Sequence, residues 1–282
     1  MKVIEDIIKK HKQVALLIGN GPNLAAGIMP SWKELLLSIS DDALAIDTEG
    51  LSNTEVYDLV QLTLGNGIDA KQRVKEKLEL TSSDCLDVHK RLMSLAIAHG
   101  CPVLTTNFDA AFEKSVGAKM YHIEAEGFTR YYPWKSYYGF AQHILPTDGF
   151  GIWKVHGDVK YKDSIRLGLT DYMGSAQRAR DIIHKGAGRL YNEYTTELWQ
   201  GCKTWLHIWF NLPIVILGFG FGIDEVFLRW LLIERKRFAN TTEKPMNVYY
   251  VTKGTPLPAI KNLMHNLGVT IKSVSSFDEI YG

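Results

Sequence analysis

Six short, almost uninterrupted apolar runs constrain the fold of this chain more than any other feature of its sequence. Strands that are buried on both faces of a parallel sheet have this continuous apolar character, whereas half-exposed strands alternate. Long stretches with helical periodicity separate the runs, which is the pattern of a parallel sheet covered by helices. The expected strands are Val14–Ile18, Pro102–Thr106, Ile152–Val155, Ile214–Gly218, Val248–Thr252 and Val269–Val274.

The expected strands are unevenly spaced along the 282 residues, a length that suits one large domain. The segments between residues 18 and 102 and between residues 155 and 214 are far longer than one crossover helix, so each must hold extra helices. We therefore predict a single α/β domain over residues 1–282, built as a Rossmann-like parallel sheet. Helical insertions near residues 30–98 and 173–212 are expected to form a cap or small lobe.

The charge balance and the cysteines exclude several classes of protein. With 32 basic and 31 acidic residues the net charge is +1, which argues against a chain that binds nucleic acid directly through its phosphates. The three cysteines are far apart and form no CxxC pair, and the histidines include no HExxH motif. We therefore expect no disulfide framework and no metal site, but free thiols in a reducing cytoplasm.

The stretch Trp205–Gly222 is apolar enough to raise the question of a membrane span. His207, Asn211 and Pro213 interrupt it and its end is rich in glycine, so it lacks the run of about 20 apolar residues that a span needs. The charged N-terminus does not have the pattern of a secretory signal. We expect a buried helix end followed by a buried strand, in a cytoplasmic protein that does not enter a membrane.

Two aromatic groups each fit more than one role. Trp199, Trp205 and Trp209 recur on an expected helix, where they suit either core packing or a partner interface. The aromatic run at residues 131–140 suits a lid, an interface or structural filling.

A glycine loop follows the first expected strand directly. Gly19 and Gly21 permit backbone conformations and close approaches that suit a dinucleotide pyrophosphate at the start of a helix. Leu24 replaces the third glycine of the GxGxxG fingerprint, and no acidic residue ends a second strand. A plain strand-to-helix turn is therefore the alternative for this loop.

Three more polar or glycine-rich segments follow expected strands. They are Thr105–Asp109 (TTNFD), Val155–Asp158 (VHGD) and Leu217–Gly222 (LGFGFG). Open parallel sheets bind ligands at the carboxyl ends of their strands. Four such segments at four strand ends therefore predict one shared binding site.

Taken in order, these segments resemble the sirtuin (SIR2-like) superfamily, and most closely the zinc-free bacterial SIR2-like NADases of antiphage defence. The motifs that carry the resemblance are Gly19–Asn23, Thr105–Asp109, His156–Gly157, Leu169–Tyr172 and Gly218–Gly220. Deacylating sirtuins also have a zinc ribbon with two CxxC pairs and a peptide clamp after the HG motif, and neither is recognisable in this sequence. The resemblance therefore implies cleavage of NAD+, bound as a substrate without a metal, more than deacylation.

The resemblance also implies roles for individual residues. Asn107 would orient the ribose and the attacking water, His156 would act as general base, and Asp109 would accept a hydrogen bond from the nicotinamide carboxamide. A structural histidine and a helix N-cap are the alternatives for His156 and Asp109, and an N-cap is the interpretation that we favour for Asp224. The implied NAD+-binding residues are Gly19, Asn20, Gly21, Asn23, Thr106, Gly218, Phe219 and Gly220.

The activity that the resemblance implies is that of an NAD+ glycohydrolase, which releases nicotinamide and ADP-ribose. Because unrestrained hydrolysis would drain the cell of NAD+, we expect an effector of antiphage defence that is silent until it is activated. A homo-oligomer, a separate sensor or activator subunit, or both would supply that activation. The alternatives are an NAD-dependent protein deacylase and a sensor that binds NAD+ or ADP-ribose without chemistry.

Overall fold

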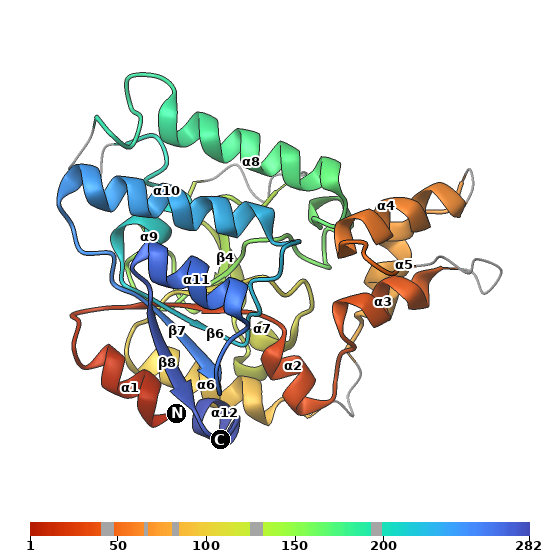
Figure 1. Cartoon of the computed structure of the whole chain (residues 1–282), viewed down its shortest axis with the longest axis horizontal. Helices are drawn as coiled ribbons and strands as arrows, with labels where there is room; N and C mark the ends of the chain where they lie inside the picture. The colour runs from red at the N-terminus through yellow and green to blue at the C-terminus, as the bar shows by residue number, and fades with distance from the viewer. Residues whose placement is uncertain (41–47, 65–66, 81–84, 125–131, 193–198) are drawn as a thin grey trace.

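An eight-stranded sheet lies at the centre of the molecule, with helices over both of its faces (Figure 1). The computed structural model describes residues 1–40, 48–64, 67–80, 85–124, 132–192 and 199–282. In the order in which they lie side by side, the strands are β3 (Lys119–His122), β4 (Ser136–Gly139), β5 (Ile152–Lys154), β2 (Val103–Thr105), β1 (Ala15–Ile18), β6 (Ile214–Leu217), β7 (Val248–Lys253) and β8 (Thr270–Val274).

Six of the strands are parallel, and they are the six that the apolar runs predicted. Taken in chain order, these six lie as third, second, first, fourth, fifth and sixth, which is the strand order of the dinucleotide-binding Rossmann fold. The chain leaves β1 toward β2 and later returns to the other side of β1 at β6. Such a reversal opens a crevice at the carboxyl ends of the strands. The predicted fold class is confirmed.

Helices cover both faces of the sheet and also form a lobe beside it (Figure 1). The helices on one face are α8 (Leu169–His184), α9 (Trp205–Asn211), α10 (Val226–Thr242) and α11 (Pro258–Leu267). Those on the other face are α1 (Lys2–Ile8), α6 (Asp87–Ala98), α7 (Ala111–Val116) and α12 (Asp278–Tyr281). The short α2 (Gly21–Ala26) follows β1, and a 3-10 turn (Lys162–Ser164) precedes α8.

Burial on both faces explains the uninterrupted apolar character of the central strands. Ala15 and Leu17 of β1 pack in the core beneath α8–α11, whereas Leu16 and Ile18 pack in the core with α1, α6 and α12. All four side chains are fully buried. The three tryptophans at positions 199, 205 and 209 are also fully buried in the first of these cores, so they are core residues and not an exposed interface.

The lobe beside the sheet has an apolar core of its own. Its helices are α3 (Trp32–Ile39), α4 (Asn53–Thr63) and α5 (Ala70–Lys77). Ser31 is the N-cap of α3, where it forms a reciprocal capping box with Glu34. These helices fall within the segment 30–98, and the division of the chain into one domain with two insertions stays a prediction.

The sequence did not predict β3 and β4, which extend the sheet in antiparallel fashion beyond β5. β4 lies within the aromatic run, and its Tyr137 ring stacks on Trp153 with the centroids 4.8 Å apart. Tyr132, Tyr137 and Tyr138 of the run are buried, whereas Phe140 is exposed, so most of the aromatic side chains at 132–140 serve as packing. Residue 131 lies outside the described residues.

The apolar stretch from Trp205 to Gly222 folds as α9, β6 and a glycine loop. Both elements are buried, which confirms the predicted helix end and strand. Among the helices that the structure describes, none is long and apolar enough to cross a membrane.

Candidate functional site

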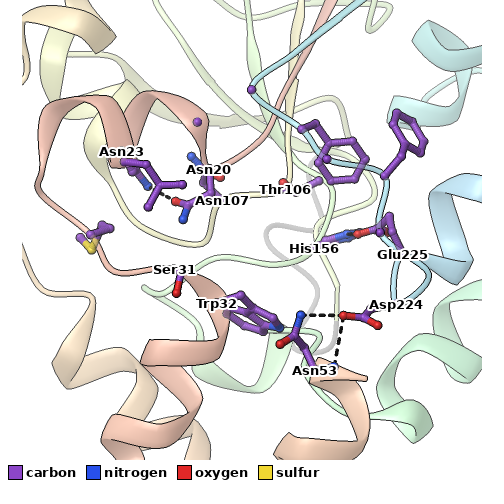
Figure 2. Close-up of a pocket in the computed structure, with 18 of the residues that line it drawn as sticks. Asn20, Asn23, Ser31, Trp32, Asn53, Thr106, Asn107, His156, Asp224 and Glu225 are labelled. Carbon is purple, nitrogen blue, oxygen red and sulfur yellow. Dashed lines mark hydrogen bonds and ion pairs between the residues drawn. The ribbon is translucent and has the colours of Figure 1, made fainter. Parts of the chain in front are cut away.

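A cleft of about 500 Å³ lies where the strand order reverses, and this volume is usual for a ligand site. The loops after β1, β2, β5 and β6 form one wall, and residues at the starts of α3 and α4 form the other (Figure 2). Gly19 is not among the lining residues. The predicted site residues that line the cleft are Asn20, Gly21, Asn23, Thr106, Asn107, Asp109, His156, Gly218, Phe219 and Gly220.

The loops after β1 and β6 interlock, and this contact requires glycine at three positions. A Cβ atom on Gly19 would lie 2.5 Å from the carbonyl oxygen of Gly218, and one on Gly21 would lie 2.5 Å from the Gly218 Cα. Gly218 itself has φ of 61°, a conformation that favours glycine. Close backbone packing therefore accounts for Gly19, which the resemblance had placed at the phosphates.

Gly220 differs from these three glycines. A Cβ atom there would meet no atom of the described residues within 4 Å, and its φ is not positive. Neither packing nor conformation requires a glycine, yet the residue lines the cleft. The adjacent Phe221 is fully buried with φ of 49°, which is rare for a bulky residue. The loop is thus held in an unusual conformation that presents the bare backbone of Gly220 to the cleft.

Asn107 has a free hydrogen-bond donor in the cleft. The side chain is 5% exposed, and its Nδ2 has no hydrogen-bond partner among the described residues. The backbone is fixed, because its N–H donates to Thr105 Oγ1 at 3.1 Å. A buried donor without a partner is costly, so its presence beside a cleft points to a ligand acceptor.

Asp109 is held by donors from within the protein. Its Oδ2 accepts from Asn23 Nδ2 at 2.7 Å, and its Oδ1 accepts from the backbone N–H of Ala111, the first residue of α7, at 2.9 Å. Asn23 also accepts a hydrogen bond from His89 Nε2 at 2.7 Å, and burial lowers the pKa of His89 to about 4. A neutral His89 from α6 thus orients Asn23 and, through it, Asp109.

His156 follows β5 and lies 3% exposed at the edge of the cleft. Its Nδ1 is 2.9 Å from the carbonyl oxygen of Val155. Its Nε2 lies 3.0 and 2.9 Å from the two carboxylate oxygens of Glu225, which is beside it in Figure 2. Gly157 turns the chain immediately afterwards with φ of 102°, a conformation that glycine alone adopts without strain. The HG motif therefore combines a side chain at the cleft with a tight turn behind it.

The N-cap of α10 is Glu225, so the interpretation of Asp224 as its cap is wrong. Glu225 Oε1 accepts from the N–H of Leu228 at 3.4 Å. Asp224 instead accepts from Asn53 at the start of α4, at 2.6 Å from its Nδ2 and 3.2 Å from its backbone nitrogen (Figure 2). This contact joins the lobe to the loop after β6 across the cleft.

A buried ammonium group lies beneath the site. Lys154 ends β5, and its Nζ is 3.0 Å from Glu113 and donates to the backbone carbonyl of Asp109. Burial lowers the pKa of Lys154, but Glu113, Asp158 and Asp109 together raise it above its ordinary value. The ammonium therefore stays charged and ties the Asp109 turn to the strand that precedes His156.

Lys253 brings a positive charge to the cleft from the end of β7. Its Nζ lies over the Phe277 ring, 5.0 Å from the centroid. Of the lining residues that the structure describes, it is the only lysine or arginine, so it is the one fixed cation available to a pyrophosphate. Within the described ranges no three His, Cys, Asp or Glu side chains gather to hold a metal ion.

Sequence reasoning missed the residues that reach the site from helices or late loops. Glu225 and His89 contact site residues that are 69 and 66 positions away, and no local motif marks them. The other lining residues that it missed include Trp32, Asn53, Tyr250, Lys253 and Tyr281.

Comparison with known families agrees with this geometry. A family model described as the SIR2-like domain matches residues 102–270, more than half of the chain, and the match includes Asn107, His156 and Gly218. No curated protein matches the chain. SIR2-like domains are typically NAD-dependent enzymes. With a Rossmann strand order, a cleft at its switch point and this match, the chain belongs to the SIR2-like domain family.

Proposed function

We propose that this chain is an NAD+ glycohydrolase that releases nicotinamide and ADP-ribose. The observation that carries the proposal is the unpartnered Nδ2 donor of Asn107 in the same cleft as His156, at the switch point of a Rossmann sheet. A neutral amide orients a ribose oxygen or a water without adding charge beside a cationic sugar.

Hydrolysis breaks the bond between C1′ of the ribose and the nicotinamide nitrogen. The electron pair of this bond leaves with nicotinamide, the oxygen of water bonds to C1′, and one proton is released. The sugar passes through an oxocarbenium-like state, which needs orientation and a proton acceptor more than a strong nucleophile. Asn107 supplies orientation, and His156 is the residue in the cleft suited to accept the proton.

The remaining cleft residues suit the rest of the dinucleotide. The open backbone of Gly220 lets a ligand approach closely, and Lys253 provides a positive charge for the phosphates. Asp109 retains acceptor capacity beyond its two internal hydrogen bonds, because each carboxylate oxygen has two lone pairs. It can therefore still accept from a carboxamide.

The test is NAD+ turnover by the purified chain, with nicotinamide and ADP-ribose quantified by chromatography. We expect His156→Ala to lower the turnover of the activated chain by about 10²- to 10⁴-fold, the usual contribution of a general base, and Asn107→Ala to abolish most of the turnover. Asn266→Ala and His265→Ala on the exposed side of α11 are matched controls and should behave as the unaltered chain.

Two results would contradict the proposal. Tight binding of NAD+ without any cleavage would favour a sensor, and release of nicotinamide only with an acyl-lysine peptide would favour a deacylase. We also propose a role as a cytoplasmic effector of antiphage defence, activated by a homo-oligomer or a separate subunit, and this rests on the resemblance alone. Rapid cleavage by the dilute chain without a partner would rule out a separate trigger.

A further inference from the structure

Both ring nitrogens of His156 face oxygen atoms, one from a backbone carbonyl and the other from a carboxylate. The carbonyl oxygen of Val155 has no hydrogen to give, so Nδ1 must donate to it. The carboxylate of Glu225 lies at 2.9 Å from Nε2, so this contact also needs a proton between the two atoms. Whichever of the two groups holds that proton, neither ring nitrogen has a lone pair left for a substrate.

This arrangement is the reverse of the one that a general base requires. A histidine base has one nitrogen held by the protein and the other open to the substrate. Here Nδ1 is turned back onto its own backbone, so Nε2 is the nitrogen that remains for the substrate. Glu225 covers it with both carboxylate oxygens.

The surrounding protein encloses the His156–Glu225 pair, and this burial stabilises the contact between the two side chains. His156 is 3% exposed and the Glu225 side chain 12%, and Tyr172 lies edge-on to the imidazole with the ring centroids 5.3 Å apart. Screening by solvent is weak for a pair buried to this extent. The surrounding walls from α8 and α10 therefore favour the closed contact.

None of the other titratable groups around the His156–Glu225 pair takes the place of either residue in this contact. Burial raises the pKa of Tyr172 and of Tyr132 well above the ordinary value, so both phenols stay neutral. Asp224 is engaged by Asn53. The backbone N–H of Arg166 donates to the carbonyl of His156, while its guanidinium lies over the Tyr132 ring, 5.1 Å from the centroid.

We infer that Glu225 is a positioning residue that covers Nε2 of His156, so that the resting chain is a slow hydrolase until Glu225 moves away. This inference rests on the proposed function, and it identifies the contact between Glu225 and His156 as the one that keeps hydrolysis slow. Glu225 ends the loop that presents Gly220 to the cleft and that Asn53 of the lobe contacts through Asp224. A ligand or a partner that shifts this loop would expose Nε2 to the cleft.

Glu225→Ser is the decisive variant. Serine is a good N-cap, so α10 keeps its cap, but the side chain is too short to reach His156. We expect kcat/KM for NAD+ to rise about tenfold or more, and this gain to vanish when His156→Ala is added. Glu225→Gln, which keeps the length without the charge, should give a smaller rise. Glu79→Gln, an exposed glutamate after α5, is the control and should change nothing.

A second readout is independent of turnover. In nitrogen NMR of the His156 ring, the Nε2 resonance should shift in Glu225→Ser because the carboxylate contact is lost, whereas the Nδ1 resonance should stay where it is. Lower turnover in Glu225→Ser with unchanged NAD+ binding would overturn the inference, because Glu225 would then assist the reaction. If no form of the chain cleaves NAD+, the proposed function fails. An unchanged Nε2 resonance in Glu225→Ser would separately overturn the inference.

Discussion

Hydrogen-bond partners decide the protonation of the buried histidines one residue at a time. The indole of Trp199 can only donate, so Nδ1 of His207 must accept at 3.1 Å and the ring is neutral. His89 donates to the side-chain oxygen Oδ1 of Asn23, and because burial lowers its pKa to about 4, it is neutral as well. His156 instead faces two oxygen acceptors, the Val155 carbonyl and the Glu225 carboxylate. Histidine thus serves as a structural acceptor and a structural donor in one molecule, and a third histidine lines the cleft.

The neutral histidines predict how the chain responds to acid. Burial lowers the pKa of His207 from 6.5 to about 4, so between these values the unfolded chain binds a proton that the folded chain does not. Stability therefore falls as the pH falls from 6.5 toward 4, by up to about 1.4 kcal/mol per pH unit for this residue. His207→Asn retains an acceptor for Trp199 but cannot titrate. The free energy of unfolding, measured with urea at several pH values in this range, should depend less steeply on pH in the variant. An equal pH dependence in both chains would refute the assignment.

At the scale of elements, the contact between α4 and the loop after β6 predicts how the lobe takes part in binding. Removing the Nδ2 donor by Asn53→Ala breaks a hydrogen bond to a charged acceptor, which is worth about 1.5–3 kcal/mol. If the lobe closes on the ligand, KM for NAD+ should rise about tenfold while kcat changes little. Hydrogen exchange in α4 should also become faster. Asn262→Ala on α11 is the control, and unchanged KM and exchange in Asn53→Ala would exclude closure.

The elements also show why the sequence predicts part of this structure and not the rest. β1 and β6 are buried on both faces, so their apolar runs identify them without ambiguity. β3 is only partly buried and pairs at the edge with a four-residue β4, so neither run stands out.

The residues of the site also divide into those that the sequence predicts and those that it does not. Asn107 and His156 follow parallel strands, whose ends must meet, whereas His89 and Glu225 reach the site through packing of helices that no short motif records.

At the scale of the whole molecule, the cleft depends on segments inside and outside the matched family region. The match begins at residue 102, whereas Gly21 of the first loop packs against Gly218 within it. The lobe closes the other wall, and α12 adds Tyr281. A dinucleotide in the cleft would therefore contact segments from both ends of the chain, and its binding energy should stabilise the entire fold rather than one loop.

Thermal unfolding tests this expectation directly. With NAD+ at about 100 times its Kd, binding should add about 2.7 kcal/mol, or roughly 5 °C in Tm for a chain of this size. His156→Ala prevents turnover during the scan. Gly21→Val, whose Cβ would lie 2.5 Å from Gly218 Cα, should force the two loops apart and lose the shift. A folded His156→Ala chain with no shift at saturating NAD+ would show that the cleft does not bind the dinucleotide, and an equal shift in Gly21→Val would show that the interlocked loops do not shape it.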